Sequence, residues 1–166
     1  MTNVAINGLG RIGRATLKIV MDTPGLNLVA ANDIGSAESV EYLVRYDTVY
    51  GRYEKPVRAT DDGYLTIGEH RLRLLREKEP GRLPWKQMSV DVVFECTGVF
   101  TKRADLDAHI RAGAAYVILS APPKGGGSGP SYPRAWARLY NAPRTLPRAG
   151  EVRHNCTGRM TSGALI

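Results

Sequence analysis

Three glycines near the N-terminus constrain this chain more than any other feature. They form the pattern Gly-x-Gly-x-x-Gly at Gly8, Gly10 and Gly13, between an apolar run and an amphipathic stretch. Asp33 follows twenty residues after Gly13, at the end of a second apolar run. This combination is typical of the first βαβ unit of a dinucleotide-binding domain, whereas the glycines alone would indicate only a tight turn.

Each of these residues has an expected part in binding. We expect Gly8 to allow a sharp turn, Gly10 to let the backbone approach a pyrophosphate, and Gly13 to let the following helix pack closely on the sheet. The helix N-terminus would offer free N–H groups to the phosphates. Asp33 would accept hydrogen bonds from the ribose hydroxyls and repel a 2′-phosphate, which favours NAD. The small residues 35–36 would tolerate that phosphate if Asp33 turned away, so NADP is the less favoured alternative.

The order of apolar and amphipathic segments predicts the fold. We expect strands at residues 3–7, 26–32, 90–95 and 116–120, and helices at 11–22, 37–46 and 103–112, with Ser36 as an N-cap. The strands are apolar without alternation, which indicates a sheet covered on both faces. Residues 57–75 contain an Asp-Gly pair between short alternating segments, which predicts an inserted antiparallel hairpin. The predicted class is α/β, a Rossmann-type parallel sheet with helices on both faces.

The composition changes abruptly after Lys124. Residues 125–166 contain seven glycines, four prolines, six arginines, no lysine and one acidic residue, and they show no helical or strand period. We therefore expect a dinucleotide-binding domain at residues 1–124 and an irregular C-terminal tail at 125–166. Such a tail also fits an out-of-frame reading of a GC-rich gene.

Charge and cysteine content exclude several classes of protein. The net charge is +7, but +5 of it belongs to residues 125–166, which carry only scattered aromatic residues, so nucleic-acid binding is not expected. No apolar run is long enough to span a membrane, and no secretory signal is visible. Cys96 and Cys156 form neither a disulfide framework nor a zinc pattern. We expect a cytoplasmic protein without a metal site.

Five segments resemble the glyceraldehyde-3-phosphate dehydrogenase family in order and spacing. They are residues 7–14 (NGLGRIGR), 31–33 (AND), 46–51 (YDTVYG), 95–100 (ECTGVF) and 120–124 (SAPPK). The resemblance covers residues 2–124. The similar erythrose-4-phosphate dehydrogenases share these motifs, so either aldehyde is a possible substrate of the family member represented here.

The resemblance implies a set of cofactor contacts beyond the three glycines. The implied positions are Asn7, Arg11 and Ile12 in the phosphate loop, Asp33 at the ribose, Lys78 beside the adenine, Thr97 and Gly98 at the nicotinamide end, and Ser120 as a second contact there. The family forms homotetramers and acts in glycolysis, and it takes NAD and a phosphorylated aldehyde.

The catalytic part of the family pattern is absent from this sequence. Family members use a cysteine thiolate, in a Ser-Cys-Thr-Thr-Asn motif, and a histidine base to convert an aldehyde to an acyl phosphate. Cys156 shares only the Cys-Thr pair and has no helical pattern after it, so we expect no catalytic residue here. A second domain supplies the histidine in the family. The sequence therefore predicts the NAD-binding part of such an enzyme, inactive alone, with a non-catalytic NAD-binding module as the alternative.

Overall fold

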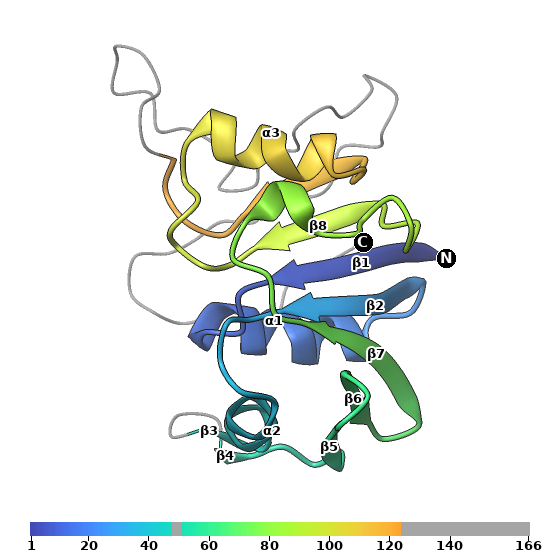
Figure 1. Cartoon of the computed structure of the whole chain (residues 1–166). Helices are drawn as coiled ribbons and strands as arrows, with labels where there is room; N and C mark the ends of the chain where they lie inside the picture. Colours follow the sequence, from blue (N-terminus) through green and yellow to red (C-terminus); the bar gives the residue numbers. More distant parts are fainter. Residues whose placement is uncertain (48–50, 124–166) are drawn as a thin grey trace.

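The apolar runs of the sequence become the parallel strands of one sheet. The computed structural model describes residues 1–47 and 51–123 (Figure 1). Its parallel strands include β1 (Thr2–Asn7), β2 (Leu26–Asn32), β8 (Val92–Glu95) and β9 (Tyr116–Leu119). Strand β1 lies between β2 and β8, so the carboxyl ends of these three strands meet at one edge of the sheet.

The predicted insertion extends the same sheet. Strands β5 (Val57–Thr60), β6 (Tyr64–Ile67) and β7 (His70–Leu75) pair in antiparallel fashion, and β7 then pairs in parallel with β2. The seven-stranded order is β5-β6-β7-β2-β1-β8-β9. The insertion is therefore a three-stranded unit rather than a single hairpin, and its last strand returns the chain to the parallel sheet.

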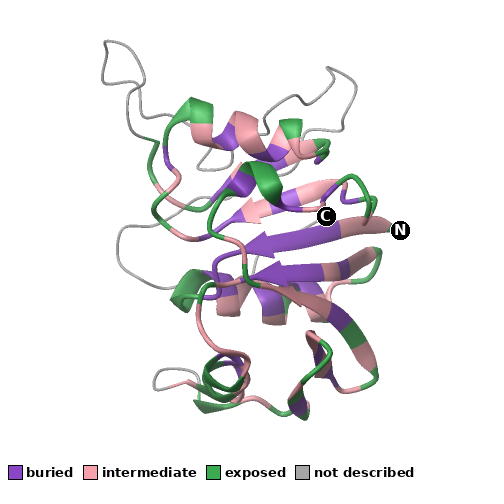
Figure 2. Ribbon diagram, viewed as in Figure 1, coloured by how far each residue is buried: buried purple, intermediate pink, exposed green. Residues whose placement is uncertain are grey.

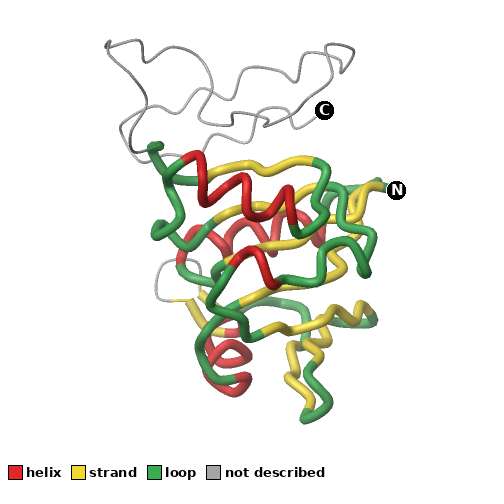
Figure 3. The backbone as a smooth tube through the Cα atoms, turned by 45° about the horizontal axis from the view of Figure 1, so that its top comes forward, coloured by secondary structure: helices red, strands yellow, loops and turns green. Residues whose placement is uncertain are grey.

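Helices cover both faces of the sheet, as predicted (Figures 1 and 3). Helices α1 (Arg11–Asp22) and α2 (Ala37–Arg45) pack on one face, and helix α3 (Arg103–Arg111) and the 3₁₀ turn η1 (Pro80–Arg82) pack on the other. Successive residues of β1 divide between the two faces, because side chains alternate along a strand. Ile6 joins the cluster under α1, and Ala5 joins the cluster under α3. Figure 2 shows β1 buried along most of its length.

The predicted boundaries are close to those of the structure. Ser36 caps α2, because its side-chain oxygen accepts a hydrogen bond from the Ser39 N–H at 3.2 Å. Strand β8 begins at Val92 rather than at residue 90, since the Val90 N–H donates to the Trp85 carbonyl outside the sheet. A two-residue ladder of β3 (Tyr46–Asp47) and β4 (Gly51–Arg52) was not predicted. No helix in the described ranges is long and apolar enough to cross a membrane. The predicted tail, residues 125–166, lies outside them.

Candidate functional site

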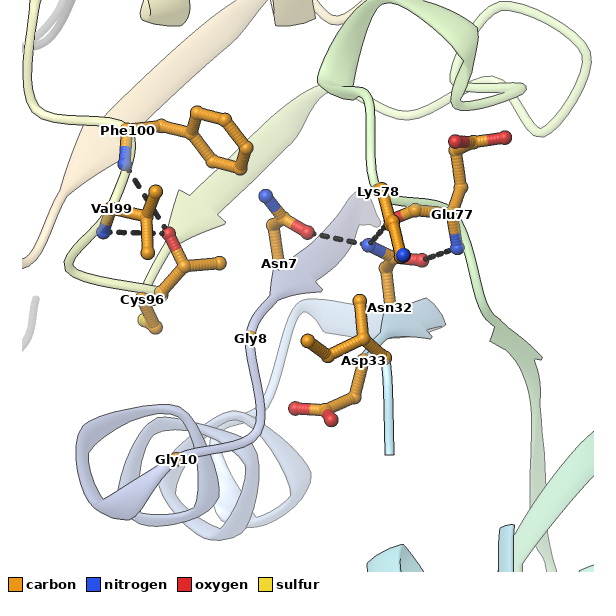
Figure 4. Close-up of a pocket in the computed structure, with 12 residues that line it drawn as sticks. Asn7, Gly8, Gly10, Asn32, Asp33, Glu77, Lys78, Cys96, Val99 and Phe100 are labelled. Atoms are coloured by element: carbon orange, nitrogen blue, oxygen red, sulfur yellow. Dashed lines mark hydrogen bonds between the residues drawn. The ribbon is translucent and has the colours of Figure 1, made fainter. Parts of the chain in front are cut away.

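A pocket opens at the edge where β1, β2 and β8 end. Figure 4 draws the residues that line it. Its volume is about 400 Å³. Asn7 lies in the middle of the view, the end of β2 and the segment after β7 lie on one side, and the turn after β8 lies on the other. The lining residues are Asn7, Gly8, Gly10, Asn32, Asp33, Ile34, Glu77, Lys78, Cys96, Thr97, Val99 and Phe100.

The three glycines have different structural requirements. A Cβ on Gly8, whose φ is +91°, would lie 2.8 Å from the Thr97 backbone. A Cβ on Gly13 would lie 1.8 Å from the Gly8 carbonyl oxygen, so helix α1 packs here against the turn itself. A Cβ on Gly10 would meet nothing within 4 Å. The fold therefore requires glycine at positions 8 and 13, whereas position 10 faces open space at the start of α1.

Asp33 lies at the end of β2 and faces the glycine turn. One carboxylate oxygen accepts a hydrogen bond from the Leu9 N–H at 2.7 Å, and the other accepts one from the Gly35 N–H at 2.8 Å. The side chain is only half-buried and lines the pocket. Two backbone donors thus fix a carboxylate at the mouth of the pocket.

Strand register places three polar side chains at one level at the base of the pocket. Asn7 is paired with Asn32 of β2 on one side and with Glu95 of β8 on the other. The Asn7 amide nitrogen donates to Glu95 Oε2 at 2.6 Å, and its oxygen accepts from Asn32 Nδ2 at 2.7 Å. The Asn32 amide oxygen accepts a hydrogen bond from the Glu77 N–H at 2.8 Å, and the Asn32 amide nitrogen donates one to the Glu77 carbonyl at 2.9 Å. This chain of amides joins β8 to the segment after β7.

Glu95 is the acceptor on which this chain converges. Its side chain is 0% exposed. Oε1 accepts hydrogen bonds from the Thr97 N–H at 2.8 Å and from the Thr97 hydroxyl. Oε2 receives the Asn7 amide and lies 3.0 Å from His109 Nε2. Four donors therefore surround a carboxylate buried at the base of the pocket.

The tautomer of His109 follows from its second partner. The Trp85 indole N–H donates to His109 Nδ1 at 2.9 Å. An indole nitrogen can only donate, so Nδ1 carries no proton and Nε2 must carry it. A neutral His109 then donates from Nε2 to Glu95, and both Trp85 and His109 are completely buried.

Some of the residues expected from the sequence line the pocket and others lie beside it. Those in the lining are Asn7, Gly8, Gly10, Asp33, Lys78 and Thr97. Those outside the lining are Arg11 and Ile12, exposed on the first turn of α1, the buried Gly13, and the exposed Gly98 and Ser120. Cys156 lies outside the described residues. Within those ranges, no group of three histidine, cysteine or acidic residues could hold a metal ion.

The sequence reasoning missed the apolar lining of the pocket. Ile34 is 61% exposed and Val99 is 72% exposed, and both line the pocket together with Phe100. All three lie in the turns that follow β2 and β8, and a large apolar residue in such a turn was the available signal. Exposed apolar side chains around one cavity indicate a surface that a ligand covers.

Cys96 also lines the pocket but is not an activated thiol. It is free and buried, and burial raises the pKa of its thiol above the ordinary value of 9.0, although hydrogen bonds with Ser120 and Thr16 oppose this shift. Because the thiolate is the nucleophilic form, Cys96 is suited to packing rather than to covalent chemistry.

Comparison with known proteins agrees with these observations. The family model described as glyceraldehyde 3-phosphate dehydrogenase, NAD binding domain, matches residues 2–103. The glyceraldehyde-3-phosphate dehydrogenase of Clostridium pasteurianum is 43% identical over 122 residues, which cover 74% of this chain and 36% of the relative. Glyceraldehyde-3-phosphate dehydrogenase 2 of Staphylococcus aureus is 42% identical over 125 residues, covering 75% and 36%.

The chain thus spans about a third of the length of the curated relatives it matches. The matched region contains the glycine turn, Asp33 and the turn after β8. The chain therefore belongs to the glyceraldehyde 3-phosphate dehydrogenase family and contains its NAD-binding domain.

Proposed function

We propose that residues 1–124 form a domain that binds NAD, with the adenosine half of the cofactor in the pocket. Asp33 carries this proposal. Its carboxylate is held at the mouth of the pocket by two backbone N–H groups, beside the open space at Gly10. A carboxylate at the end of the second strand is the group that accepts hydrogen bonds from an adenosine ribose.

The apolar walls of the pocket suit the adenine ring. Ile34 lines the pocket directly after Asp33 in the chain, and Val99 and Phe100 lie on the side of the pocket opposite Asp33 (Figure 4). A flat ring between them would cover the exposed apolar surface of both walls. Lys78 lines the same pocket, beside Glu77. Because Thr97 lies in this pocket too, we place it with the adenosine half of the cofactor instead of with the nicotinamide.

The start of helix α1 suits the pyrophosphate. Gly10 is its N-cap, no side chain caps its first N–H groups, and its first turn carries no acidic residue. These N–H groups and the helix dipole favour an anion there. Arg11 and Ile12 are exposed on this first turn and would contact the phosphates and the sugar beyond them. Gly98 and Ser120, both exposed near the end of β8 and β9, remain proposed contacts toward the nicotinamide.

Asp33 also favours NAD over NADP. A 2′-phosphate would lie against its carboxylate, and Asp33 could turn away only by giving up both hydrogen bonds to the Leu9 and Gly35 N–H groups. The structure therefore adds a cost to the movement that NADP would require. We propose NAD as the cofactor and NADP as the weaker ligand.

The full activity of the family is a further proposal. The chain is the cofactor-binding part of an NAD-dependent enzyme that converts a phosphorylated aldehyde to an acyl phosphate, with glyceraldehyde 3-phosphate or erythrose 4-phosphate as the aldehyde. The family thiol motif is absent from the sequence, so we propose that this chain binds NAD without turning over substrate. Homotetramer formation and a cytoplasmic location stay predictions.

Calorimetry with fragments of the cofactor tests the adenosine placement. We expect ADP-ribose and ADP to bind and to compete with NAD, because they contain the part that the pocket holds, and nicotinamide mononucleotide to bind much more weakly. Equal binding of nicotinamide mononucleotide and ADP-ribose would contradict the placement.

A turnover assay distinguishes a chain that only binds NAD from a chain that is a working enzyme. It measures NADH formation from glyceraldehyde 3-phosphate and phosphate, with Cys156→Ser as the control. We expect no turnover. Turnover that disappears in Cys156→Ser would show instead that the chain is a working enzyme.

A further inference from the structure

We propose that Glu95 is a positioning residue that holds both walls of the cofactor pocket in place and so sets the affinity for the adenosine half. This inference rests on the proposed NAD site. Glu95 does not line the pocket and is fully buried, so it cannot contact a ligand itself. It acts through Asn7 on one side and through Thr97 on the other.

The first wall is the segment of Glu77 and Lys78. It is linked to Glu95 through the side-chain amides of Asn7 and Asn32, whose orientation is fixed at both ends. Glu95 can only accept, so Asn7 must turn its nitrogen toward it. At the far end, Asn32 exchanges two hydrogen bonds with the Glu77 backbone, which requires its oxygen toward the N–H and its nitrogen toward the carbonyl. Both ends demand the same orientation, with Asn32 Nδ2 donating to Asn7 Oδ1 at 2.7 Å. The Glu77 segment, which carries Lys78 into the pocket, is thereby fixed.

The second wall is the turn that carries Val99 and Phe100, and Thr97 links it to Glu95. The Thr97 hydroxyl donates its proton to Glu95, so its lone pairs are free to accept from the turn that follows. It accepts the Val99 N–H at 3.1 Å and the Phe100 N–H at 3.5 Å. These contacts hold the apolar side of the proposed adenine slot.

Helix α3 provides a third hydrogen-bonded link to Glu95. His109 of α3 donates to Glu95 and accepts from Trp85, as described above. All four donors around Glu95 thus point inward, and three of them cannot be reversed, since Asn7 and His109 are fixed by their other partners and the Thr97 N–H is backbone. Only a group that accepts at every position satisfies this arrangement.

The substitution Glu95→Gln is therefore expected to disturb the Thr97 side of the pocket more than the Asn7 side. The glutamine oxygen must face Asn7 and His109, because neither can become an acceptor there. Its NH₂ group then faces Thr97, where the hydroxyl can rotate but the backbone N–H cannot. We expect displacement of the Thr97 turn and little change in the Asn7 chain.

The experiment measures ADP and NAD affinity of the whole chain by calorimetry, at a temperature where each variant is folded by circular dichroism. We expect Glu95→Gln and Thr97→Val each to raise the dissociation constant of ADP about tenfold, which is ~1.4 kcal/mol. The double variant is expected to be no weaker than either single variant, because both remove the same link. Thr97→Ser retains the hydroxyl, and we expect it to recover most of the affinity that Thr97→Val loses. Asp91→Asn is the matched control, since Asp91 accepts the Asn3 N–H at 2.8 Å at the opposite edge of the sheet.

The outcomes separate this inference from the proposed function. Wild-type affinity in Glu95→Gln or in Thr97→Val, or additive effects in the double variant, overturns the positioning role while NAD binding by the wild-type chain stands. No binding of ADP or NAD by the folded wild-type chain overturns both. If Glu95→Gln does not fold, the histidine measurement described next tests the arrangement of donors around Glu95 without any substitution.

A second measurement needs no substitution and no ligand. Long-range ¹H–¹⁵N spectra report which nitrogen of a histidine carries the proton. We expect His109 to show a protonated Nε2 and an unprotonated Nδ1 at neutral pH. The opposite tautomer would leave the Trp85 N–H facing a second donor and would contradict the inward direction of the donors on which the positioning role depends.

Discussion

Two carboxylates flank the end of β1 and are used in opposite ways. Asp33 directly follows β2 on one side and Glu95 is the last residue of β8 on the other, and both accept hydrogen bonds from backbone N–H groups. Asp33 is half-buried, lines the pocket and leaves room for a ligand. Glu95 is fully buried, is absent from the pocket lining and has a donor for each lone pair in reach.

The difference shows how one functional group serves contact in one place and support in the other. A carboxylate that keeps access to solvent can exchange water for ribose hydroxyls at little cost. A carboxylate that is sealed in and fully satisfied cannot take a new partner, and it can only fix the groups that do. We assign ligand contact to Asp33 and positioning to Glu95 on this basis.

Replacing each carboxylate by alanine gives the largest expected difference between the two sites, in the free energy of unfolding. Glu95→Ala leaves the buried donors of Asn7, Thr97 and His109 without an acceptor, and we expect a loss of about 4 kcal/mol in the free energy of unfolding. Asp33→Ala exposes the Leu9 and Gly35 N–H groups to water, and we expect a loss of about 1 kcal/mol. Urea unfolding measures both. Equal losses would remove the distinction between the two sites.

The glycine turn between the two carboxylates sharpens the comparison next. Gly13→Ala would place a Cβ 1.8 Å from the Gly8 carbonyl oxygen, and we expect a loss of about 3 kcal/mol in unfolding free energy, because backbone must move. Gly10→Ala meets no protein atom within 4 Å. Its stability should change by less than about 1 kcal/mol, while its NAD affinity falls because the methyl group occupies the proposed phosphate space. A Gly10→Ala variant with unchanged NAD affinity would contradict the proposed phosphate position.

The smallest expected effect is the pH dependence of stability that Cys96 contributes. Cys96 lies next to Glu95 in the chain. Burial raises the pKa of its thiol above 9.0, so the folded chain keeps the proton at a pH where the unfolded chain loses it. The free energy of unfolding should therefore be unaffected by this group below pH 9 and decrease above it. In a Cys156→Ser background, iodoacetamide at pH 8 should modify the folded chain at least about tenfold more slowly than the chain in urea. Similar rates would show that the thiol is accessible and not shifted.

The sequence was sufficient for the fold because its signals are local. The glycine spacing, Asp33 and the first two apolar strands all lie within residues 2–33, so one continuous stretch of sequence determines the βαβ unit. The predicted strand at residues 90–95 starts too early, because the Val90 N–H donates to the Trp85 carbonyl five residues before it instead of joining the sheet. The inserted unit was predicted as antiparallel, but its return to β2 depends on pairing across the sheet.

The site was only partly predictable for the same reason. Asp33 stands in a recognised pattern, whereas Glu95 is one polar residue at the end of an apolar strand. Its importance comes from His109, Trp85 and Asn7, which belong to three other segments and meet only in the folded sheet. Thr97 was predicted beside the nicotinamide, and that it lines the same pocket as Asp33 is visible only in the folded structure.

The most direct test of the account is the cofactor preference of the chain and of Asp33→Ala. Calorimetry with NAD and with NADP gives the four dissociation constants. We predict that the wild-type chain binds NAD more tightly than NADP, and that Asp33→Ala reduces the ratio of the two affinities about tenfold, because the mutant loses the ribose contact and the repulsion of the 2′-phosphate together. An unchanged ratio in Asp33→Ala, or no binding of NAD by the folded wild-type chain, would contradict the assignment of Asp33 and the pocket to the adenosine of NAD.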